Sequence, residues 1–375
     1  MDIFESLVQL NQTIQVVDMH TSGEPTRIVV RGYPHLEGET LLEKRRCAAN
    51  KHDNFRKQLM REPRGHAEMY GAILVQETEL TRSGEADIGV LFCHNEGYST
   101  MCGHATIALG RFLIDTHDFT VFPRRKELPY DPGTGLTALR LHAPCGVIQV
   151  HVSTQNDSAE TSSSVSFLGV PSYSTQVDFD VIIPPDNRWP QLTAQSVKLD
   201  VAFGGAFYAI VQDRELGFPH GLKNAVLAEL NTATRLLKKT VADLHQNVLR
   251  HPDQDLRFLY GVIVVDTTAS DPDEELGICF FADQQIDRSP TGSGVMARVA
   301  LAIEKDILHL GDSKTYHSIV SVGSGLGFRG TAIERVSEGV VVKVEGRAFY
   351  TGVGSFIVED GDSLADGLVV RGGLM

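Results

Sequence analysis

The segment Met101-Cys102-Gly103-His104 places a thiol at the start of a predicted helix. The stretch that it opens, residues 101–113, is small or apolar on nearly every side, and a helix of that kind is usually buried. Free backbone N–H groups and the helix dipole favour negative charge at a helix start, so a thiol there has a lowered pKa. Cys102 is therefore a candidate base or nucleophile, although a buried structural cysteine is the commoner fate of this residue type.

A second junction of the same kind lies about half a chain later. The segment Asp287 to Gly294 (DRSPTGSG) precedes another apolar stretch, residues 291–303, and Thr291 lies 189 residues after Cys102 (291 − 102). Pro290 and the hydroxyl groups suit an ordinary capped helix. Two such helices can nevertheless aim their N-termini at one anion. A carboxylate held there would have its alpha carbon flanked by Cys102 and Thr291.

The elements around the two junctions predict a duplicated α/β fold. Each half offers short segments rich in Val and Ile, separated by turns, before its apolar helix. A charged segment, residues 41–59, is predicted to be helical, and the serine-rich run 153–164 is the expected domain boundary. The expected strands are residues 14–19, 26–32, 72–76, 86–92, 161–168, 207–211, 259–266 and 278–282.

Composition excludes several classes of function. The formal net charge is −14 and no run of Lys and Arg is longer than three, which argues against nucleic-acid binding. No stretch approaches the ~20 apolar residues that span a bilayer, so no membrane partner is expected. The first ten residues lack the apolar core of a signal peptide. With five cysteines and no CxxC pair, these features predict a cytoplasmic protein without disulfides.

Other motifs are given simpler interpretations. Cys93-His94 together with Cys102 and His104 has no spacing typical of a zinc module. Gly325 to Gly330 matches GxGxxG, but the segment that follows has the pattern of turn and strand, whereas a dinucleotide site needs a helix. We predict a glycine-rich turn there and a tight turn at Phe203 to Phe207.

Motifs spread in order along nearly the whole chain resemble those of proline racemases and hydroxyproline epimerases. They are Asp18 to Pro25 (DMHTSGEP), Glu62 to His66 (EPRGH), Met101 to His104, Phe281 to Gly294 and Tyr350 to Gly352. The resemblance implies an α/β (α+β) fold similar to diaminopimelate epimerase, with two pseudo-symmetric domains that each wrap strands around a central helix. The expected N-terminal domain, 1–155 plus about 350–375, carries Cys102. The expected C-terminal domain, 156–349, carries Thr291, and the active site is expected in the cleft between them.

The resemblance also assigns roles to the residues around both junctions. It implies that Asp287 and His104 contact the ring nitrogen of a substrate, and that Tyr70 and Phe281 form aromatic walls around its ring. The backbone that binds the substrate carboxylate is expected at Gly103, His104, Gly292 and Ser293.

Cofactors and partners follow from the same resemblance. The family works without pyridoxal phosphate, so no cofactor and no metal are expected. The expected partner is a small molecule of the hydroxyproline type. Members of the family are often dimers, and a homodimer stays open because the sequence identifies no interface.

Position 291 departs from the racemase pattern, in which a cysteine stands on each face of the alpha carbon. Thr291 is far too weak an acid to serve as a base near neutral pH, so one thiol, Cys102, remains. The pair of Cys102 and Thr291 resembles the family members that dehydrate trans-3-hydroxy-L-proline to Δ1-pyrroline-2-carboxylate, and it implies a hydro-lyase. Thr291 is then a positioning or space-filling residue.

Two alternatives stay open. One is a proline racemase or 4-hydroxyproline 2-epimerase that uses some other second acid. The other is a non-catalytic binder of proline-like amino acids, against which the presence of Cys102 and Asp287 argues.

Overall fold

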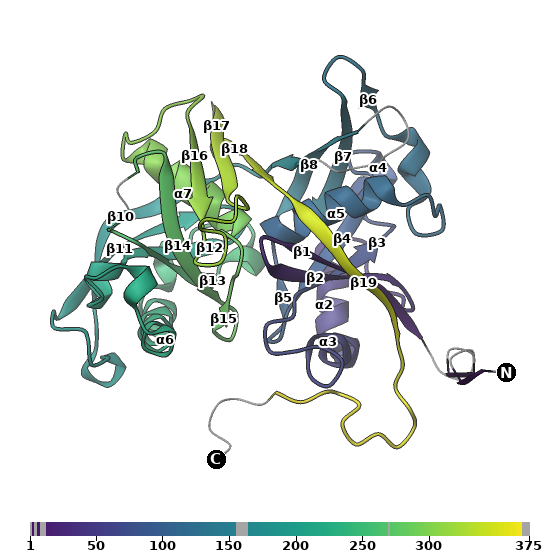
Figure 1. The fold of residues 1–375 in the computed structure, drawn as a ribbon, viewed down its shortest axis with the longest axis horizontal. Helices are drawn as coiled ribbons and strands as arrows, with labels where there is room; N and C mark the ends of the chain where they lie inside the picture. The colour runs from purple at the N-terminus through teal and green to yellow at the C-terminus, as the bar shows by residue number, and fades with distance from the viewer. Residues whose placement is uncertain (1, 4–5, 8–12, 155–163, 269–270, 370–375) are drawn as a thin grey trace. The chain divides into compact units, whose positions relative to one another are not determined.

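The fold is described from a computed structural model, which covers residues 2–3, 6–7, 13–154, 164–268 and 271–369 (Figure 1). The chain divides into two compact units. The first comprises Met1–Thr100, Ala105–Val165 and Arg347–Met375, and the second Met101–His104 and Ser166–Gly346. Most of the serine-rich run expected as a boundary, residues 155–163, lies outside the described residues. The cleft expected between the domains stays a prediction.

The first unit is built on a mixed sheet. Its strands are β1 (Ile14–Thr21), β2 (Glu24–Arg31), β3 (Gly71–Val75), β4 (Ile88–Cys93), β5 (Tyr98–Ser99), β6 (Tyr130–Asp131), β7 (Leu136–Ala143), β8 (Gly146–Ser153) and β19 (Ala348–Phe356). β1 pairs antiparallel with β19 and with β2, β2 runs parallel to β3, and β3 antiparallel to β4. β4 then pairs parallel with β7, which is antiparallel to β8. The helices are α2 (Leu41–Lys51), α3 (Asp53–Met60), α4 (Glu79–Ser83), α5 (Gly103–Asp115) and the 3-10 turn η1 (Pro123–Glu127).

The second unit uses a sheet of the same kind. Its strands are β9 (Val165–Leu168), β10 (Tyr173–Ile182), β11 (Ser196–Phe203), β12 (Phe207–Gln212), β13 (Leu259–Val265), β14 (Glu274–Phe281), β15 (Gln285–Ile286), β16 (Ser313–His317), β17 (Phe328–Val336) and β18 (Gly339–Gly346). β11 pairs antiparallel with β10 and β12, β12 parallel with β13, and β13 antiparallel with β14. β14 runs parallel to β16, which is antiparallel to β17. The helices are α6 (Leu227–Leu244), α7 (Gly292–Glu304), η2 (Pro185–Asn187), η3 (Asp213–Leu216), η4 (Leu222–Asn224), η5 (Gln246–Val248) and η6 (Gln254–Leu256).

The two units repeat one topology. The order β1, β2, helices α2 and α3, β3, β4, β5, α5, β7, β8 recurs as β11, β12, α6, β13, β14, β15, α7, β16, β17. The pairing directions recur as well: β2 with β3 and β12 with β13 are parallel, as are β4 with β7 and β14 with β16. The predicted mixed α/β fold, with a duplicated unit around a central helix, is therefore confirmed.

Each central helix is buried within its strands, as its apolar sequence predicts. In α7 only the last turn reaches the surface, and the helix packs against β10, β11, β12, β17 and β18 (Figure 1). In α5, Gly110 lets the helix lie against β8, because a Cβ there would come within 2.7 Å of a Val150 methyl group. The sheets thus hold both helices rigidly, and with them the residues at their N-terminal ends.

Some elements differ from the sequence prediction. The helix expected at residues 41–59 is broken into α2 and α3 at His52, whose backbone (φ −130°, ψ 19°) is not helical. Helix α6 was not expected, although Leu230, Ala233, Leu237 and Val241 form a buried stripe at helical spacing. The segment Gly325 to Gly330 is followed by strand and turn in β17 and β18, and not by a helix, as predicted. Among the described residues, no helix is both long and apolar enough to cross a membrane.

Candidate active site

Cys102 immediately precedes α5 and is 5% exposed. Its Sγ atom lies 3.3 Å from Nδ1 and 3.5 Å from Nε2 of His104, which occupies the first turn of the helix. Met101–His104 groups with the second unit although the rest of α5 belongs to the first. An imidazole beside a thiol at a helix start is an environment that stabilises a thiolate, so the geometry suits a base at Cys102.

Thr291 occupies the matching position before α7, with an unusual backbone. Its φ of 63° and ψ of 88° fall in the left-handed region, which is an outlier for a β-branched residue and costs on the order of 1–3 kcal/mol. Its N–H donates to Ser289 Oγ at 3.1 Å, its Oγ1 donates to Asp287 Oδ2 at 2.8 Å, and its carbonyl accepts from the N–H of Val295 at 2.7 Å. The hydroxyl proton is therefore committed to a carboxylate.

Asp287 is 3% exposed and lies at the start of the loop that joins β15 to α7. Its other oxygen, Oδ1, accepts the backbone N–H of Ser289 at 2.8 Å. Burial raises the pKa of Asp287 to about 6, against the hydrogen bonds from Ser289 and Thr291, which lower it. Cys279 on β14 is a buried neighbour, and burial and the Asp287 charge both raise the pKa of its thiol. Asp287 thus changes its charge close to neutral pH.

The starts of α5 and α7 come together at their glycines. A Cβ added to Gly103 would lie 2.3 Å from the Cα of Gly292, and one added to Gly292 would lie 2.7 Å from the Cα of Gly103. No side chain fits at such distances, so glycine is required at both positions. This approach brings the first turns of the two helices side by side, and the binding of an anion there stays a prediction.

Two further predicted residues border α7. Ser293 lies in the first turn of α7, and its Oγ shares a hydrogen bond of 2.6 Å with the hydroxyl of Tyr208 on β12. Phe281, at the end of β14, is 2% exposed and lies 5.6 Å from the ring of Tyr260. Tyr208 in turn meets the edge of Tyr260. An aromatic group therefore supports the first turn of α7.

The family of the chain is decided by a match along nearly its full length. The proline racemase family model matches residues 16–369. The chain belongs to the proline racemase family. It is 42% identical over 364 residues to a trans-L-3-hydroxyproline dehydratase of Pongo abelii and 41% identical over 364 residues to the human trans-3-hydroxy-L-proline dehydratase, covering in both cases 96% of this chain and 95% of the relative.

A solved member of the family shows the same fold. The hydroxyproline epimerase of Agrobacterium vitis, with bound trans-4-hydroxy-L-proline, superposes with a TM-score of 0.78 at 22% identity, over 96% of this chain and 95% of that one. At that identity it carries the fold and not the substrate.

Most of the site residues predicted for the present protein lie in its second unit. These are Cys102, Gly103, His104, Phe281, Asp287, Thr291, Gly292 and Ser293. Tyr70 belongs to the first unit, where its hydroxyl shares a hydrogen bond of 2.5 Å with Ser99 Oγ and its ring lies 5.9 Å from that of His94. The roles of all these residues toward a substrate stay predictions.

Sequence reasoning missed the residues that support the site. Tyr208 lies in an apolar strand, where no local sequence pattern marks it as a functional residue. Ser289 lies in the segment Asp287 to Gly294, but the sequence assigned it no role. Gly204 was assigned only to a tight turn, which the structure confirms between β11 and β12. A Cβ on Gly204 would lie 2.1 Å from the carbonyl oxygen of Ser293, so this turn packs directly on the start of α7.

Proposed function

We propose that this protein is a trans-3-hydroxy-L-proline dehydratase, a hydro-lyase that forms Δ1-pyrroline-2-carboxylate and water. The observation that carries the proposal is the hydroxyl of Thr291, bound to Asp287, where an isomerase of the family would need a second thiol. The dehydratases that share 41–42% identity with the chain support the same substrate. The reaction is proposed to need no cofactor and to take place in the cytoplasm.

The stereochemistry of the substrate suits a single base. In trans-3-hydroxy-L-proline the hydroxyl and the carboxylate lie on opposite faces of the ring, so the alpha hydrogen and the hydroxyl share a face. The Cys102 thiolate takes the alpha proton, and the electron pair left on the alpha carbon forms the Cα–Cβ double bond as the Cβ–O bond breaks. The thiol then gives its proton to the departing oxygen, which leaves as water.

The groups around Cys102 supply the rest of the mechanism. N–H groups at the starts of α5 and α7 bind the carboxylate and stabilise the charge that develops on it, in the manner of a preorganised oxyanion site. Asp287 and His104 hold the ring nitrogen. General acid assistance by the protonated thiol is typically worth ~10²–10⁴ in rate. The enamine product becomes the imine by tautomerisation, without a further enzyme group.

One observation favours a second candidate, an epimerase or racemase. A protonated Asp287 that donated through the hydroxyl of Thr291 would supply a proton to the face opposite Cys102. The pKa of about 6 makes a protonated Asp287 accessible. Such a relay needs both Asp287 and Thr291 to give up and regain a proton at each turnover, whereas dehydration needs only Cys102 to exchange a proton.

The test is incubation of the purified protein with trans-3-hydroxy-L-proline, with detection of Δ1-pyrroline-2-carboxylate by o-aminobenzaldehyde. L-proline and trans-4-hydroxy-L-proline are followed in parallel by polarimetry, in buffer with EDTA and no pyridoxal phosphate. We expect imine from the first substrate and constant rotation of the other two. Rotation that changes without imine would replace the proposal by the isomerase, and binding without either change would replace it by a non-catalytic binder.

A further inference from the structure

Helix α7 carries a buried cation that its counterpart lacks. Arg298 is 4% exposed, and the offset of 189 residues between the two junctions places it opposite Leu109 of α5 (298 − 189), which is fully buried. A buried charge is costly unless it is paired and hydrogen-bonded. The side chain must therefore make specific contacts in the second unit.

Those contacts reach the loop of Thr291 on one side. Arg298 Nη2 donates to the carbonyl of Pro290 at 2.8 Å, and Nε donates to the carbonyl of Gly294 at 3.4 Å. Pro290 directly precedes Thr291, and Gly294 lies in the first turn of α7. The guanidinium thus bridges the two backbone carbonyl groups on either side of the strained residue.

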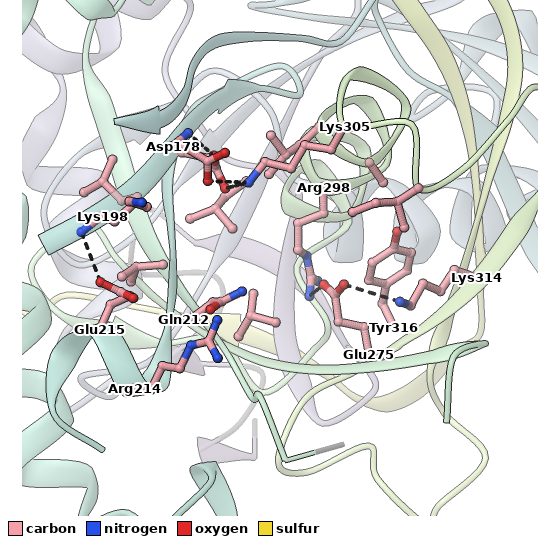
Figure 2. Close-up of a pocket in the computed structure, with 18 residues that line it drawn as sticks. Asp178, Lys198, Gln212, Arg214, Glu215, Glu275, Arg298, Lys305, Lys314 and Tyr316 are labelled. Carbon is pink, nitrogen blue, oxygen red and sulfur yellow. Dashed lines mark hydrogen bonds and ion pairs between the residues drawn. The ribbon is translucent and has the colours of Figure 1, made fainter. Parts of the chain in front are cut away.

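On its other side the guanidinium is anchored to the sheet. Arg298 Nη1 lies 3.0 Å from Glu275 Oε1, and the guanidinium lies 4.6 Å from the centre of the Tyr316 ring. Figure 2 shows Lys314 approaching the same carboxylate, at 3.7 Å from Oε2, on the wall of a cavity of about 410 Å³. Glu275 belongs to β14 and Tyr316 to β16. The planar fork is therefore fixed by two neighbouring strands before it meets the loop.

We propose that Arg298 is a positioning residue, which holds the loop before α7 so that Thr291 keeps its left-handed backbone and its hydroxyl bond to Asp287. The catalytic role of that loop rests on the proposed function. A strained conformation persists only where its surroundings over-determine it. Ser289 and Asp287 hold Thr291 from within the loop, and Val295 in the first turn of α7 donates to its carbonyl at 2.7 Å. Arg298 adds a restraint on the flanking carbonyl groups that is anchored in the neighbouring strands β14 and β16.

The test compares Arg298→Met and Arg298→Lys with Arg111→Met on the counterpart helix. Arg111 is a close match, because it donates to the carbonyl of Ala348 at 2.6 Å, pairs with Asp115 and lies over the Tyr350 ring at 4.8 Å, yet none of these contacts is at a helix start. Arg298→Met is expected to lower kcat by roughly 10–100-fold, the loss typical of small misplacements in a catalytic site. Arg111→Met is expected to lower Tm and leave kcat unchanged.

A pH profile separates positioning from a purely structural role. If Thr291 leaves Asp287, the carboxylate loses a donor and the acidic limb of kcat/KM moves to higher pH. The charged or titratable neighbours of Asp287 are Arg288 on its own loop, Cys279 on β14 and Tyr208 on β12, and none is changed. Arg298→Lys keeps the positive charge, but one ammonium cannot repeat the fork. The same shift in that variant is therefore due to geometry.

The outcomes decide the proposal at each step. The positioning role would be overturned if Arg298→Met had a lower Tm but an unchanged kcat and an unchanged acidic limb of kcat/KM. If Arg298→Met does not fold, the same result in Arg298→Lys would overturn it. Hydrogen exchange of residues 286–295 needs no turnover, and we expect faster exchange in both Arg298 variants and no change in Arg111→Met. If the wild-type protein does not dehydrate trans-3-hydroxy-L-proline, the proposed function is wrong, but hydrogen exchange still tests the positioning role. Unchanged exchange of residues 286–295 in the Arg298 variants would overturn that role.

Discussion

The starts of α5 and α7 are two versions of one device. Both helices have 13 residues, begin with glycine and directly follow Cys102 and Thr291, which are 189 residues apart (291 − 102). At the first, a thiol faces an imidazole at 3.3 Å; at the second, a hydroxyl donates to a carboxylate at 2.8 Å. The first arrangement favours loss of a proton to give an anion, and the second ties the proton down.

The two helix starts share their backbone geometry but differ in the side chains that could do chemistry. The glycine contact between the two helix starts is shared by both, in keeping with the proposal that they bind one anion together. The residue before each helix and the partner of that residue are among the differences between the two. At the second helix start, the negative charge of Asp287 works against an anion at position 291.

The largest effect is expected from removal of the thiol. Cys102→Ser replaces the base by a hydroxyl, and we expect dehydration to fall by about 10²–10⁴-fold, the range of general acid–base catalysis. The measurement is the rate of imine formation at saturating substrate. Cys47→Ser serves as the control, because Cys47 is also buried but lies in the core of the first unit. Dehydration by Cys102→Ser within tenfold of wild type would mean that the base is elsewhere.

Restoring the symmetry is the next test. Thr291→Cys gives each helix a thiol, and we expect it to gain slow epimerisation of trans-4-hydroxy-L-proline. The gain should be greater at higher pH, because burial and Asp287 disfavour a thiolate there as they do at Cys279. Polarimetry under a reductant measures it, with Thr291→Ser as the matched variant that adds no thiol. An absence of inversion at every pH would make the one-base explanation too simple.

The sequence predicted those features of the two helix starts that depend on local residue patterns. Two apolar helices opening with glycine were visible at residues 101–113 and 291–303, and the fold followed from them and from the strands between. The support of the site was not predictable, since Tyr208 meets Ser293 across 85 residues of sequence. The anchors of Arg298, Glu275 and Tyr316, lie on two neighbouring strands whose pairing no local pattern shows. Nor does any local pattern show that Thr291 adopts a positive φ, which its loop contacts impose.

The pH dependence of the enzyme tests the second arrangement. With the pKa of Asp287 at about 6, kcat/KM should fall roughly tenfold from its plateau to pH 5, because this carboxylate, which we propose holds the ring nitrogen, is then protonated. Thr291→Val removes a hydrogen bond that lowers this pKa, so its acidic limb should lie at higher pH. A profile from pH 5 to 9 measures both, and an unchanged limb in Thr291→Val would mean that Asp287 does not set it.

The same group links pH to stability. Its pKa in the folded protein is above the ordinary value of 3.8, so folding favours the protonated form. The stabilisation is therefore full below pH 3.8 and is lost as the pH rises through about 6. Urea unfolding at pH 5 and pH 8 should show a smaller difference for Asp287→Asn than for the wild type. An equal difference in both proteins would contradict the assignment.

The smallest effect is expected at the aromatic support of α7. Tyr208→Phe keeps the ring but removes the hydroxyl that meets Ser293 Oγ at 2.6 Å. A net hydrogen bond is worth about 0.5–1.5 kcal/mol, so kcat/KM should fall by roughly 2–10-fold. Tyr33→Phe is the control, since its hydroxyl meets that of Tyr98 at 3.1 Å in the first unit and its loss should affect Tm alone. If both variants lowered only Tm, Ser293 would be held by its helix without Tyr208, and the support of the two helix starts would differ less than their chemistry.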